Sequence, residues 1–372
     1  MIHLSHAADA SDGGIATAVA GLRQAQQAAG LAAGWVTADR YPPLHRDHQL
    51  SSGLLAASPP LLHLHGLWRS PTRCAPRLVA AGIPLVIAPH GMLDAGALAI
   101  SRRRKQLVWH LWEQRALASA RCLHALCAAE AAAIRALLPQ APIAIIPNGV
   151  NTSVASGHRQ PPPAWAGTIP SGEPVLLFLG RFHAKKGLSP LLDAWQAAAA
   201  AAQRAGWWLA LVGYGDGGAL ARRVAAAQAR GELQRLLVLP PAFGADKTAI
   251  LHAASAFVLP SFSEGLPMAA LEAMGHRLPC LLSDACNLPQ AFSAGAALPA
   301  APQPAALVMA LERLFALSPA ERAAMGAAGA ALVHEQFSWP QVAEQTRQLY
   351  TWILAGGTPP AFVQLPAAVT SR

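Results

Sequence analysis

The chain has 372 residues, 53% of them hydrophobic, and a formal net charge of +9. No uninterrupted apolar run reaches the roughly 20 residues of a transmembrane helix, and no charged segment precedes an apolar one at the N-terminus as in a signal peptide. With five scattered cysteines, an odd number, we expect a reduced cytoplasmic protein that is long enough for two domains.

Short apolar runs alternate with helical stretches through the first 150 residues. Strands are predicted at 2–4, 33–37, 61–65, 84–88, 121–124 and 143–146. This alternation is typical of a parallel, doubly wound sheet of the α/β class. A glycine turn, Asp12-Gly13-Gly14, leads from the first strand into a helix.

Histidines lie in or just after two of these strands. His63 lies within the third strand, where we expect a packed core residue, whereas the role of His65 at its end stays open. His90 stands in a Pro-His-Gly turn after the fourth strand. His63 and His65 have no obvious third ligand, and the chain lacks H-E-x-x-H, paired C-x-x-C and Asp-x-Asp elements. We therefore expect no metal site.

A dense basic run occupies residues 102–105, and Trp109 and Trp112 follow it at helical spacing. Two interpretations stay open: a helix lying on an anionic membrane surface, or a solvated helix face with the tryptophans turned into the core. The membrane interpretation predicts that Arg102–Lys105 is exposed. The basic residues form no known nucleic-acid-binding motif, so we expect no nucleic acid as a partner.

The region after residue 151 is polar and contains three successive prolines at 161–163, which indicates a linker. A second series of strands begins near residues 175, 208, 236, 256 and 279. The predicted parts are an N-terminal domain at 1–160, a C-terminal domain at 161–340, a helix at 341–356 and a loose, proline-rich tail at 357–372.

The turn after the strand at 175–179 carries cations between two glycines, Gly180 and Gly187. Arg181 can fork onto two phosphate oxygens and Lys186 acts as a point charge, whereas we interpret Lys185 as solvated. Open α/β sheets bind ligands at this carboxyl edge. A further turn after the strand at 208–212 has Gly213, which would let the backbone approach a ligand.

The most informative segment, SFSEGLPMAALEAM at 261–274, places Glu264 and Glu272 eight residues apart across a loop and the start of a helix. We predict that this helix runs from Pro267 to about Gly275. Its start would direct backbone amides at a phosphate or a sugar hydroxyl, namely those of Leu266, Met268 and Ala269. The alternative is an amphipathic helix with a capping carboxylate.

The E-G-L-P-x-x-x-x-E element, the G-R-x-x-x-x-K-G element and the turns at 213–217 and 241–247 together resemble the retaining nucleotide-sugar glycosyltransferases of glycosyltransferase family 4. The resemblance implies the GT-B architecture, with two Rossmann-like domains facing a cleft. It also implies that the helix after Trp339-Pro340 crosses back to the first domain.

The resemblance implies a role for each motif residue. Glu264 would contact the donor sugar and Glu272 the ribose hydroxyls, Arg181 and Lys186 would neutralise the donor diphosphate, and His90 would reach the reacting sugar. The implied catalytic residues are therefore His90, Arg181, Lys186 and Glu264. The implied donor-binding residues are Gly13, Gly14, Gly180, Gly213, Gly265, Leu266, Pro267, Met268 and Glu272.

The activity implied is that of a retaining, metal-independent hexosyltransferase without a cofactor. Its donor would be a UDP- or GDP-sugar, and its acceptor a glycan or a polyprenyl-linked glycan of surface, exo- or lipopolysaccharide biosynthesis. It would work in the cytoplasm, where a peripheral contact with the anionic inner face of the membrane suits such an acceptor. Another GT-B enzyme, such as a sugar-nucleotide epimerase or a disaccharide phosphorylase, and a non-catalytic nucleotide-sugar-binding subunit remain as alternatives.

Overall fold

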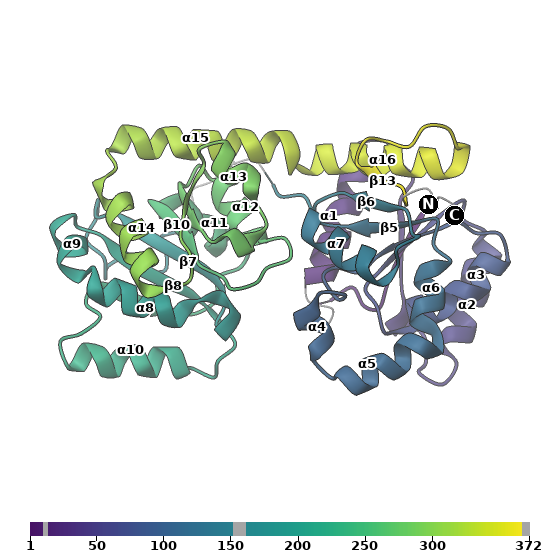
Figure 1. Cartoon of the computed structure of the whole chain (residues 1–372), viewed down its shortest axis with the longest axis horizontal. Helices are drawn as coiled ribbons and strands as arrows, with labels where there is room; N and C mark the ends of the chain where they lie inside the picture. The colour runs from purple at the N-terminus through teal and green to yellow at the C-terminus, as the bar shows by residue number, and fades with distance from the viewer. Residues whose placement is uncertain (10–13, 152–160, 367–372) are drawn as a thin grey trace, which may run out of the picture. The chain divides into compact units, whose positions relative to one another are not determined.

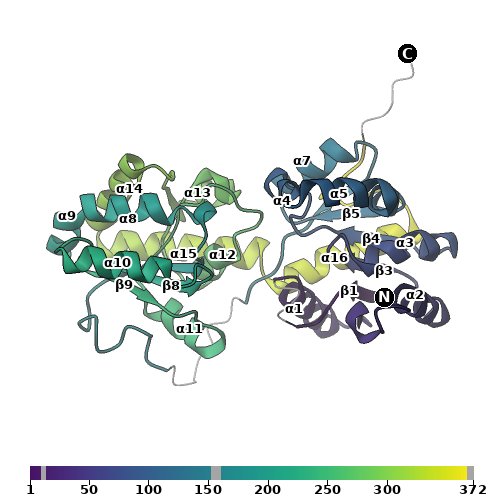
Figure 2. The ribbon, with the colours of Figure 1, turned by 90° about the horizontal axis from the view of Figure 1, so that it is seen from below.

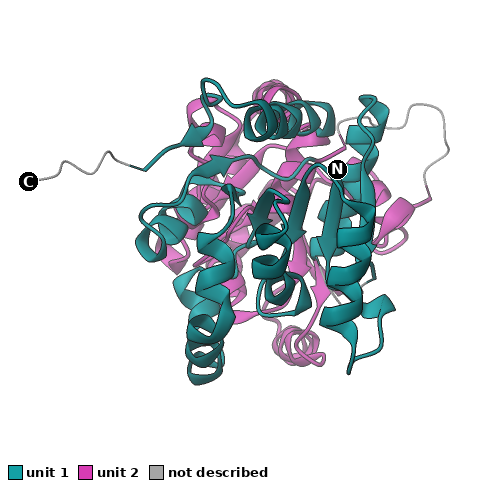
Figure 3. Ribbon diagram, turned by 90° about the vertical axis from the view of Figure 1, so that its right-hand side faces the viewer, with its two compact units in different colours: residues 1–149, 339–372 teal, residues 150–338 magenta. Residues whose placement is uncertain are grey.

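The computed structural model describes residues 1–9, 14–151 and 161–366 (Figure 1). The chain divides into two compact units, residues 1–149 with 339–372 and residues 150–338 (Figure 3). Each unit has its own parallel sheet and its own core, which confirms the predicted α/β class with two Rossmann-like domains. The units divide at residue 149 rather than at 160, and the helix that begins at Trp339 belongs to the first unit.

The first unit holds a seven-stranded sheet in the order β13-β6-β5-β4-β3-β1-β2. Its strands are β1 (Ile2–Ser5), β2 (Gly34–Thr37), β3 (Leu62–His65), β4 (Leu85–Ala88), β5 (Cys122–Ala125), β6 (Ile143–Ile145) and β13 (Val363–Gln364). All neighbours run parallel except β13, which pairs antiparallel with β6. We predicted a loose tail from residue 357, whereas Val363 and Gln364 form this edge strand.

Helices cover both faces of this sheet. They are α1 (Gly14–Ala28), α2 (Arg46–Ala57), α3 (Ser70–Ala80), α4 (Ala95–Ala99), α5 (Arg102–Val108), α6 (Gln114–Ala118), α7 (Ala128–Leu137) and α16 (Trp339–Ala355), with a 3₁₀ turn η2 (Ala38–Arg40) and a π-helical turn η3 (Trp109–Glu113). Side chains alternate along each strand. Leu62 and Leu64 of β3 therefore pack with α2 and α3, while Leu61 packs with α1 and α16 on the other face. Helices α1 and α16 lie side by side (Figure 2).

The second unit holds a six-stranded parallel sheet in the order β12-β11-β10-β7-β8-β9. Its strands are β7 (Val175–Arg181), β8 (Trp208–Tyr214), β9 (Leu236–Leu239), β10 (Ala256–Leu259), β11 (Cys280–Leu282) and β12 (Ala297–Pro299). Its helices are α8 (Leu188–Ala197), α9 (Ala199–Arg204), α10 (Ala219–Ala229), α11 (Gly244–Ala253), α12 (Met268–Gly275), α13 (Pro289–Ser293), α14 (Pro304–Ala316) and α15 (Pro319–Gln336), with 3₁₀ turns η4 (Ala184–Lys186) and η5 (Asp284–Cys286). Residues 175–178 are all buried because helices cover both faces of the sheet.

The strand order of the second unit reverses beside β7. The chain passes from β7 to β8 and β9 on one side and then returns to β10 on the other side of β7. At such a reversal the connections leave the two strands in opposite directions, which opens a crevice at their carboxyl ends. The motifs that follow β7 and β10 therefore meet where an α/β sheet binds its ligand.

Candidate active site

The turn after β7 lies unusually close to the turn after β10. Gly187 has φ +70°, and a Cβ atom there would lie 1.9 Å from the carbonyl oxygen of Pro260. The amide of Phe262 also donates to the carbonyl of Lys185 at 2.7 Å. Only glycine permits both this conformation and this approach, so the glycine of the motif joins the two turns.

This contact places a buried ion pair at the carboxyl edge of the sheet. Nζ of Lys186 lies 2.6 Å from Oε1 of Glu264, and the two side chains are 16% and 7% exposed. The hydroxyl of Ser261 donates to the same carboxylate oxygen at 2.6 Å. The side-chain amide of Asn287 donates to the backbone carbonyl of Glu264 at 2.6 Å. Glu264 is therefore held by its side chain and its backbone, and the sequence analysis assigned no role to Ser261 or Asn287.

Arg181, the last residue of β7, is exposed. Within the described part of the chain, the structure gives its guanidinium no ion pair with a carboxylate. The two cations at the end of β7 therefore have different surroundings. Lys186 is half-buried and paired with Glu264, whereas Arg181 is exposed to solvent. An exposed guanidinium is suited to two-point binding of a phosphate.

The two glycines at the ends of β7 and β8 have a packing role. A Cβ atom on Gly213 would lie 1.9 Å from the carbonyl oxygen of Gly180 and 2.8 Å from the ring of Phe182. Gly213 therefore has to be glycine because the two strand ends approach each other closely, whether or not a ligand lies against it.

The helix after Glu264 begins one residue later than predicted. Pro267 is its N-cap, with ψ 82°, and α12 begins at Met268. The amide of Met268 already donates to the carbonyl of Leu266 at 3.0 Å, so it does not belong to the unpaired amides that we expected at this helix start. Gly265 has open space where a side chain would stand.

Glu272 forms an ion pair that the sequence did not predict. Nζ of Lys247, on α11, lies 2.7 Å from Oε1 of Glu272, and both side chains are partly exposed. At the start of α11, Phe243 stacks obliquely with Tyr214 at a ring-centroid distance of 6.4 Å. Phe243 and Tyr214 are 67% and 49% exposed, so the pair of rings is accessible to a ligand. The sequence analysis assigned no role to these two rings, although each stands directly beside a glycine in a turn that follows a strand.

In the first unit, a buried glutamate holds the turn that carries His90. His90 and Gly91 have φ +55° and +74°, a left-handed conformation that costs energy at a histidine. Oε1 of Glu130 accepts from the amide of Gly91 at 2.6 Å, and Oε2 accepts from the amide of Leu126 at 2.8 Å. Burial raises the pKa of Glu130 to about 7. Of the predicted glycine turn, Gly14 opens α1, whereas Gly13 lies outside the described residues.

The histidines of β1 and β3 form a buried cluster with His90. Nδ1 of His65 lies 3.0 Å from Nε2 of His90, and Nε2 of His65 lies 2.9 Å from Nδ1 of His3. His63 is packed in the core, where Nδ1 lies 2.7 Å from the hydroxyl of Tyr350.

We found no third ligand for His63 and His65 in the sequence, but His3 lies beside both of them. The nitrogens of these three histidines lie within 4.8 Å of one another, which is close enough for a shared metal ion. An ion there would have to replace hydrogen bonds that the same nitrogens already make.

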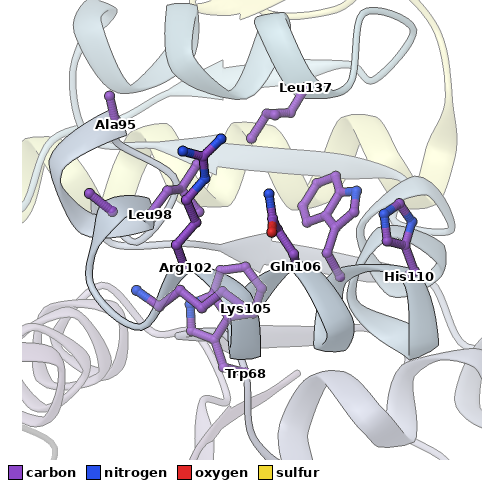
Figure 4. Close-up of a pocket in the computed structure, with 10 residues that line it drawn as sticks. Trp68, Ala95, Leu98, Arg102, Lys105, Gln106, His110 and Leu137 are labelled. Carbon is purple, nitrogen blue, oxygen red and sulfur yellow. The ribbon is translucent and has the colours of Figure 1, made fainter.

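A pocket of about 400 Å³ lies on the first unit (Figure 4). Arg102, Lys105 and Gln106 of α5 lie on one side, and Leu137 of α7 lies on the other. Nζ of Lys105 donates to the carbonyl of Ala97 and lies 5.7 Å from the ring centroid of Trp68. The pocket therefore combines cationic groups with aromatic and aliphatic walls.

The basic segment beside this pocket is exposed at Arg102–Arg104, whereas Lys105 is half-buried. Trp109 and Trp112 are half-buried, which agrees with tryptophans turned toward the core. The exposed apolar side chains are instead Ile100, Leu107 and Leu111, at 69%, 61% and 63%. In the part of the chain that the structure describes, no helix is both long and apolar enough to cross a membrane.

Each of the two units matches a model of a known protein family. Residues 173–316, within the second unit, match the family model "Glycosyl transferases group 1", and residues 48–149, within the first, match the "Glycosyl transferase 4-like domain". The chain is a glycosyltransferase of the GT-B fold class.

Solved structures give the same fold for this glycosyltransferase. Sucrose-phosphate synthase from Thermosynechococcus elongatus is 22% identical, with a TM-score of 0.71 over 96% of this chain and 99% of that one. WaaG, a glycosyltransferase involved in lipopolysaccharide biosynthesis, is 15% identical, with a TM-score of 0.67 over 96% and 100%. Anabaena HepE, in complex with UDP and glucose, is 15% identical, with a TM-score of 0.66 over 94% and 98%. A search of curated proteins gave no match.

Proposed function

We propose that this glycosyltransferase is a retaining, metal-independent hexosyltransferase that uses a UDP- or GDP-sugar. The observation that carries the proposal is the buried pair of Lys186 and Glu264 beside the exposed Arg181, at the reversal of strand order in the second unit. Two cations and a fixed carboxylate suit a ligand that joins a diphosphate to a sugar. The solved structure of HepE with UDP and glucose supports this class of donor.

In the proposed reaction the bond between the anomeric carbon and the diphosphate oxygen breaks. The acceptor oxygen bonds to the same face of the anomeric carbon, and its proton passes to the departing phosphate. Arg181 and Lys186 stabilise the negative charge that develops on the diphosphate. Glu264 positions the sugar and supports the positive charge at the anomeric carbon. Glu272 would accept hydrogen bonds from the ribose hydroxyls, with Lys247 holding its carboxylate.

A thermal shift experiment tests the donor site. Purified protein is heated with UDP, GDP, ADP and their sugar conjugates, with and without EDTA. A nucleotide at a hundredfold its dissociation constant stabilises the folded state by about 2.7 kcal/mol. We expect one nucleotide family to raise the melting temperature, equally with EDTA, and Glu272→Ala to abolish that rise.

Glu312→Ala is the matched control, because Glu312 is exposed on α14 of the same unit. It should keep the full nucleotide response. Stabilisation that appears only with a divalent metal would contradict metal independence, and no response to any nucleotide would contradict the donor site. Release of an epimerised sugar from the donor alone would favour the sugar-nucleotide epimerase alternative, and donor binding without turnover a non-catalytic subunit.

We propose that the acceptor is a glycan or a polyprenyl-linked glycan of surface polysaccharide biosynthesis, recognised on the first unit at the cytoplasmic face of the membrane. The pocket beside Lys105 and Trp68 combines cationic and apolar groups, which suits an anionic amphiphile. Next to it, exposed Leu107 and Leu111 stand one helical turn apart after three exposed arginines. Cations with exposed leucines are typical of a helix that lies on an anionic membrane.

Vesicle binding tests this surface. Each arginine near an anionic membrane contributes roughly 1 kcal/mol, so changing Arg102, Arg103 and Arg104 to Glu should weaken binding to phosphatidylglycerol vesicles by at least about a hundredfold. The control changes Arg204, Arg222 and Arg313 to Glu, which are exposed on helices of the second unit and carry the same change of charge. Equal loss in the two triple variants would refute a specific membrane surface.

A further inference from the structure

A continuous chain of hydrogen bonds runs through the interior of the first unit and ends at His90. It involves side chains of four strands or their following turns, β1, β3, β4 and β5, together with α1 and α16. Its members in order are His124, His63, Tyr350, Gln26, His3, His65 and His90, with Thr346 as a branch at Gln26. Apart from the half-buried His90, all of these side chains are buried.

The contact at the His124 end of this hydrogen-bond chain determines which atom of each bond is the donor. Nε2 of His124 lies 2.7 Å from the carbonyl oxygen of Ile146, which can only accept, so Nε2 must carry the proton. In a neutral imidazole Nδ1 of His124 is then an acceptor, and Nε2 of His63, 3.2 Å away, must donate to it. Nδ1 of His63 in turn accepts from the hydroxyl of Tyr350.

The branch at Thr346 independently determines the donors in the same way. The hydroxyl of Thr346 donates to the carbonyl of Ala343 at 2.9 Å, so its oxygen must accept from Gln26 at 3.0 Å. The amide nitrogen of Gln26 therefore faces Thr346 and Tyr350, and Oε1 faces Nε2 of His3 at 2.8 Å. The amide is oriented by its partners rather than by an arbitrary choice.

The orientation of Gln26 then determines the donors of the remaining bonds, from His3 as far as His90. Nε2 of His3 donates to Gln26, so Nδ1 of His3 accepts from Nε2 of His65 at 2.9 Å. Nδ1 of His65 in turn accepts from Nε2 of His90 at 3.0 Å. With all the histidines neutral, each bond has one donor and one acceptor, and the proton of His90 lies on Nε2.

We propose that Gln26, His3 and His65 are positioning residues that hold His90 in the tautomer with a proton on Nε2 and a lone pair on Nδ1. His90 would then accept a hydrogen bond from a hydroxyl of the sugar substrate and would not donate one. The proton on Nε2 follows from the hydrogen-bond chain and the lone pair on Nδ1 from the neutral, buried ring, whereas the contact with a sugar hydroxyl rests on the proposed function. Glu130 contributes by holding the backbone of the same turn through Gly91.

The electrostatics of the cluster agree with neutral rings. Burial lowers the pKa of His3 and His124 to about 4 and that of His90 to about 3. A second proton on His3 or His124 would set two donors against each other at about 3 Å and break the chain. Nδ1 of His90 lies outside the chain, and burial keeps this ring neutral.

The ring nitrogens report the tautomer directly. Long-range proton–nitrogen NMR on the full chain, with ¹⁵N in the histidines and His90→Gln for assignment, distinguishes protonated from unprotonated nitrogens. We expect His90, His65 and His3 each to show a protonated Nε2 and an unprotonated Nδ1 at neutral pH. A charged His90, a proton on its Nδ1, or a stoichiometric metal ion bound to His3, His63 and His65 in the purified protein would overturn the proposal.

Two nearly isosteric variants, one at Gln26 and one at Tyr350 on the side of Gln26 away from His90, separate positioning from packing. Gln26→Leu removes the acceptor of His3 and should produce a mixture of tautomers at His90. Tyr350→Phe removes only the hydroxyl on the branch toward His63, so His90 should keep its tautomer. An unchanged His90 in Gln26→Leu would overturn the proposal. The wild-type spectrum decides the tautomer even if Gln26→Leu fails to fold.

Kinetics with the donor found in the thermal scan complete the test. Gln26→Leu should lower kcat/KM by about tenfold or more, because the hydroxyl of the sugar meets a misplaced partner. In the His90→Ala background the same change should cost nothing further, since Gln26 acts only through His90. Equal losses in both backgrounds would mean that Gln26 acts on the fold and would overturn the positioning role. An inactive wild type with the expected tautomer would count against the proposed function alone.

Discussion

Arg181→Ala is expected to reduce the rate of sugar transfer by about 10²- to 10³-fold while changing the free energy of unfolding by less than about 0.5 kcal/mol. Arg181 is exposed and has no carboxylate partner among the described residues, so its removal leaves no buried charge behind. Its guanidinium stands at the carboxyl end of β7, where the proposed diphosphate would develop charge during transfer. Such a loss of activity without a loss of stability is typical of a residue that acts on the ligand.

The neighbouring cations provide the controls. Lys185 is half-buried rather than fully solvated as predicted, and it has no carboxylate partner among the described residues. Lys185→Ala removes a positive charge from the same turn and should lower the rate by less than about threefold, since an unpaired cation without a ligand contact contributes little. Lys186→Met should lower both rate and stability, because it leaves the 7%-exposed carboxylate of Glu264 unpaired. Steady-state kinetics and chemical unfolding of the three variants are compared. If Lys185→Ala were as damaging as Arg181→Ala, general positive charge would explain the effect, and a specific phosphate contact would not.

Acid is expected to destabilise the first unit more than the second. Five histidines of the buried chain have pKa values below the ordinary 6.5, and the largest cause for each is burial. An unfolded chain binds protons at these positions as the pH falls below about 6.5, whereas the folded unit does not. The free energy of unfolding should therefore keep its full value above about pH 6.5 and should decrease progressively as the pH is lowered toward 4.

Two buried glutamates of the same unit oppose this trend. Burial raises the pKa of Glu113 and Glu130 to about 7, so these side chains bind protons at a higher pH in the folded state than in the unfolded chain. Their contribution to the free energy of unfolding is therefore present at low pH and is lost as the pH rises toward 7. Five histidines against two glutamates leave the unfolded chain with about three more bound protons near pH 5.5. The free energy of unfolding then changes by at most about 4 kcal/mol per pH unit.

Hydrogen exchange measures this difference within one molecule. Between pH 7.5 and 5.5, amides of β1, β3 and β5 should lose protection after correction for intrinsic exchange, while amides of β7, β8 and β10 should retain it. The second unit thus serves as the control for the first. Equal loss of protection in the two units would show that the histidines do not determine the acid response.

The strands of the site were predictable because their signals are local. The apolar run at 175–179 is buried on both sides, and the glycines and cations that follow it come in a continuous motif. The start of α12 was predicted one residue too early because Pro267, although its φ suits a helix, takes a ψ of 82° as N-cap. The pairing of Glu272 with Lys247 depends on how far α11 lies from α12, which neither segment encodes alone.

The sequence by itself determined the fold class, the identity of the motif residues and the burial of His63, because apolar periodicity and turn chemistry act over a few neighbouring residues. The tertiary structure alone decided that Gly187 and Pro260 meet, that Lys186 lies on Glu264 and that β13 closes an edge of the sheet. It also decided that His3 lies beside His65, 62 residues away in the sequence, since β1 pairs with β3. Strand order brings these groups together, and strand order follows from the packing of whole helices against both faces of a sheet.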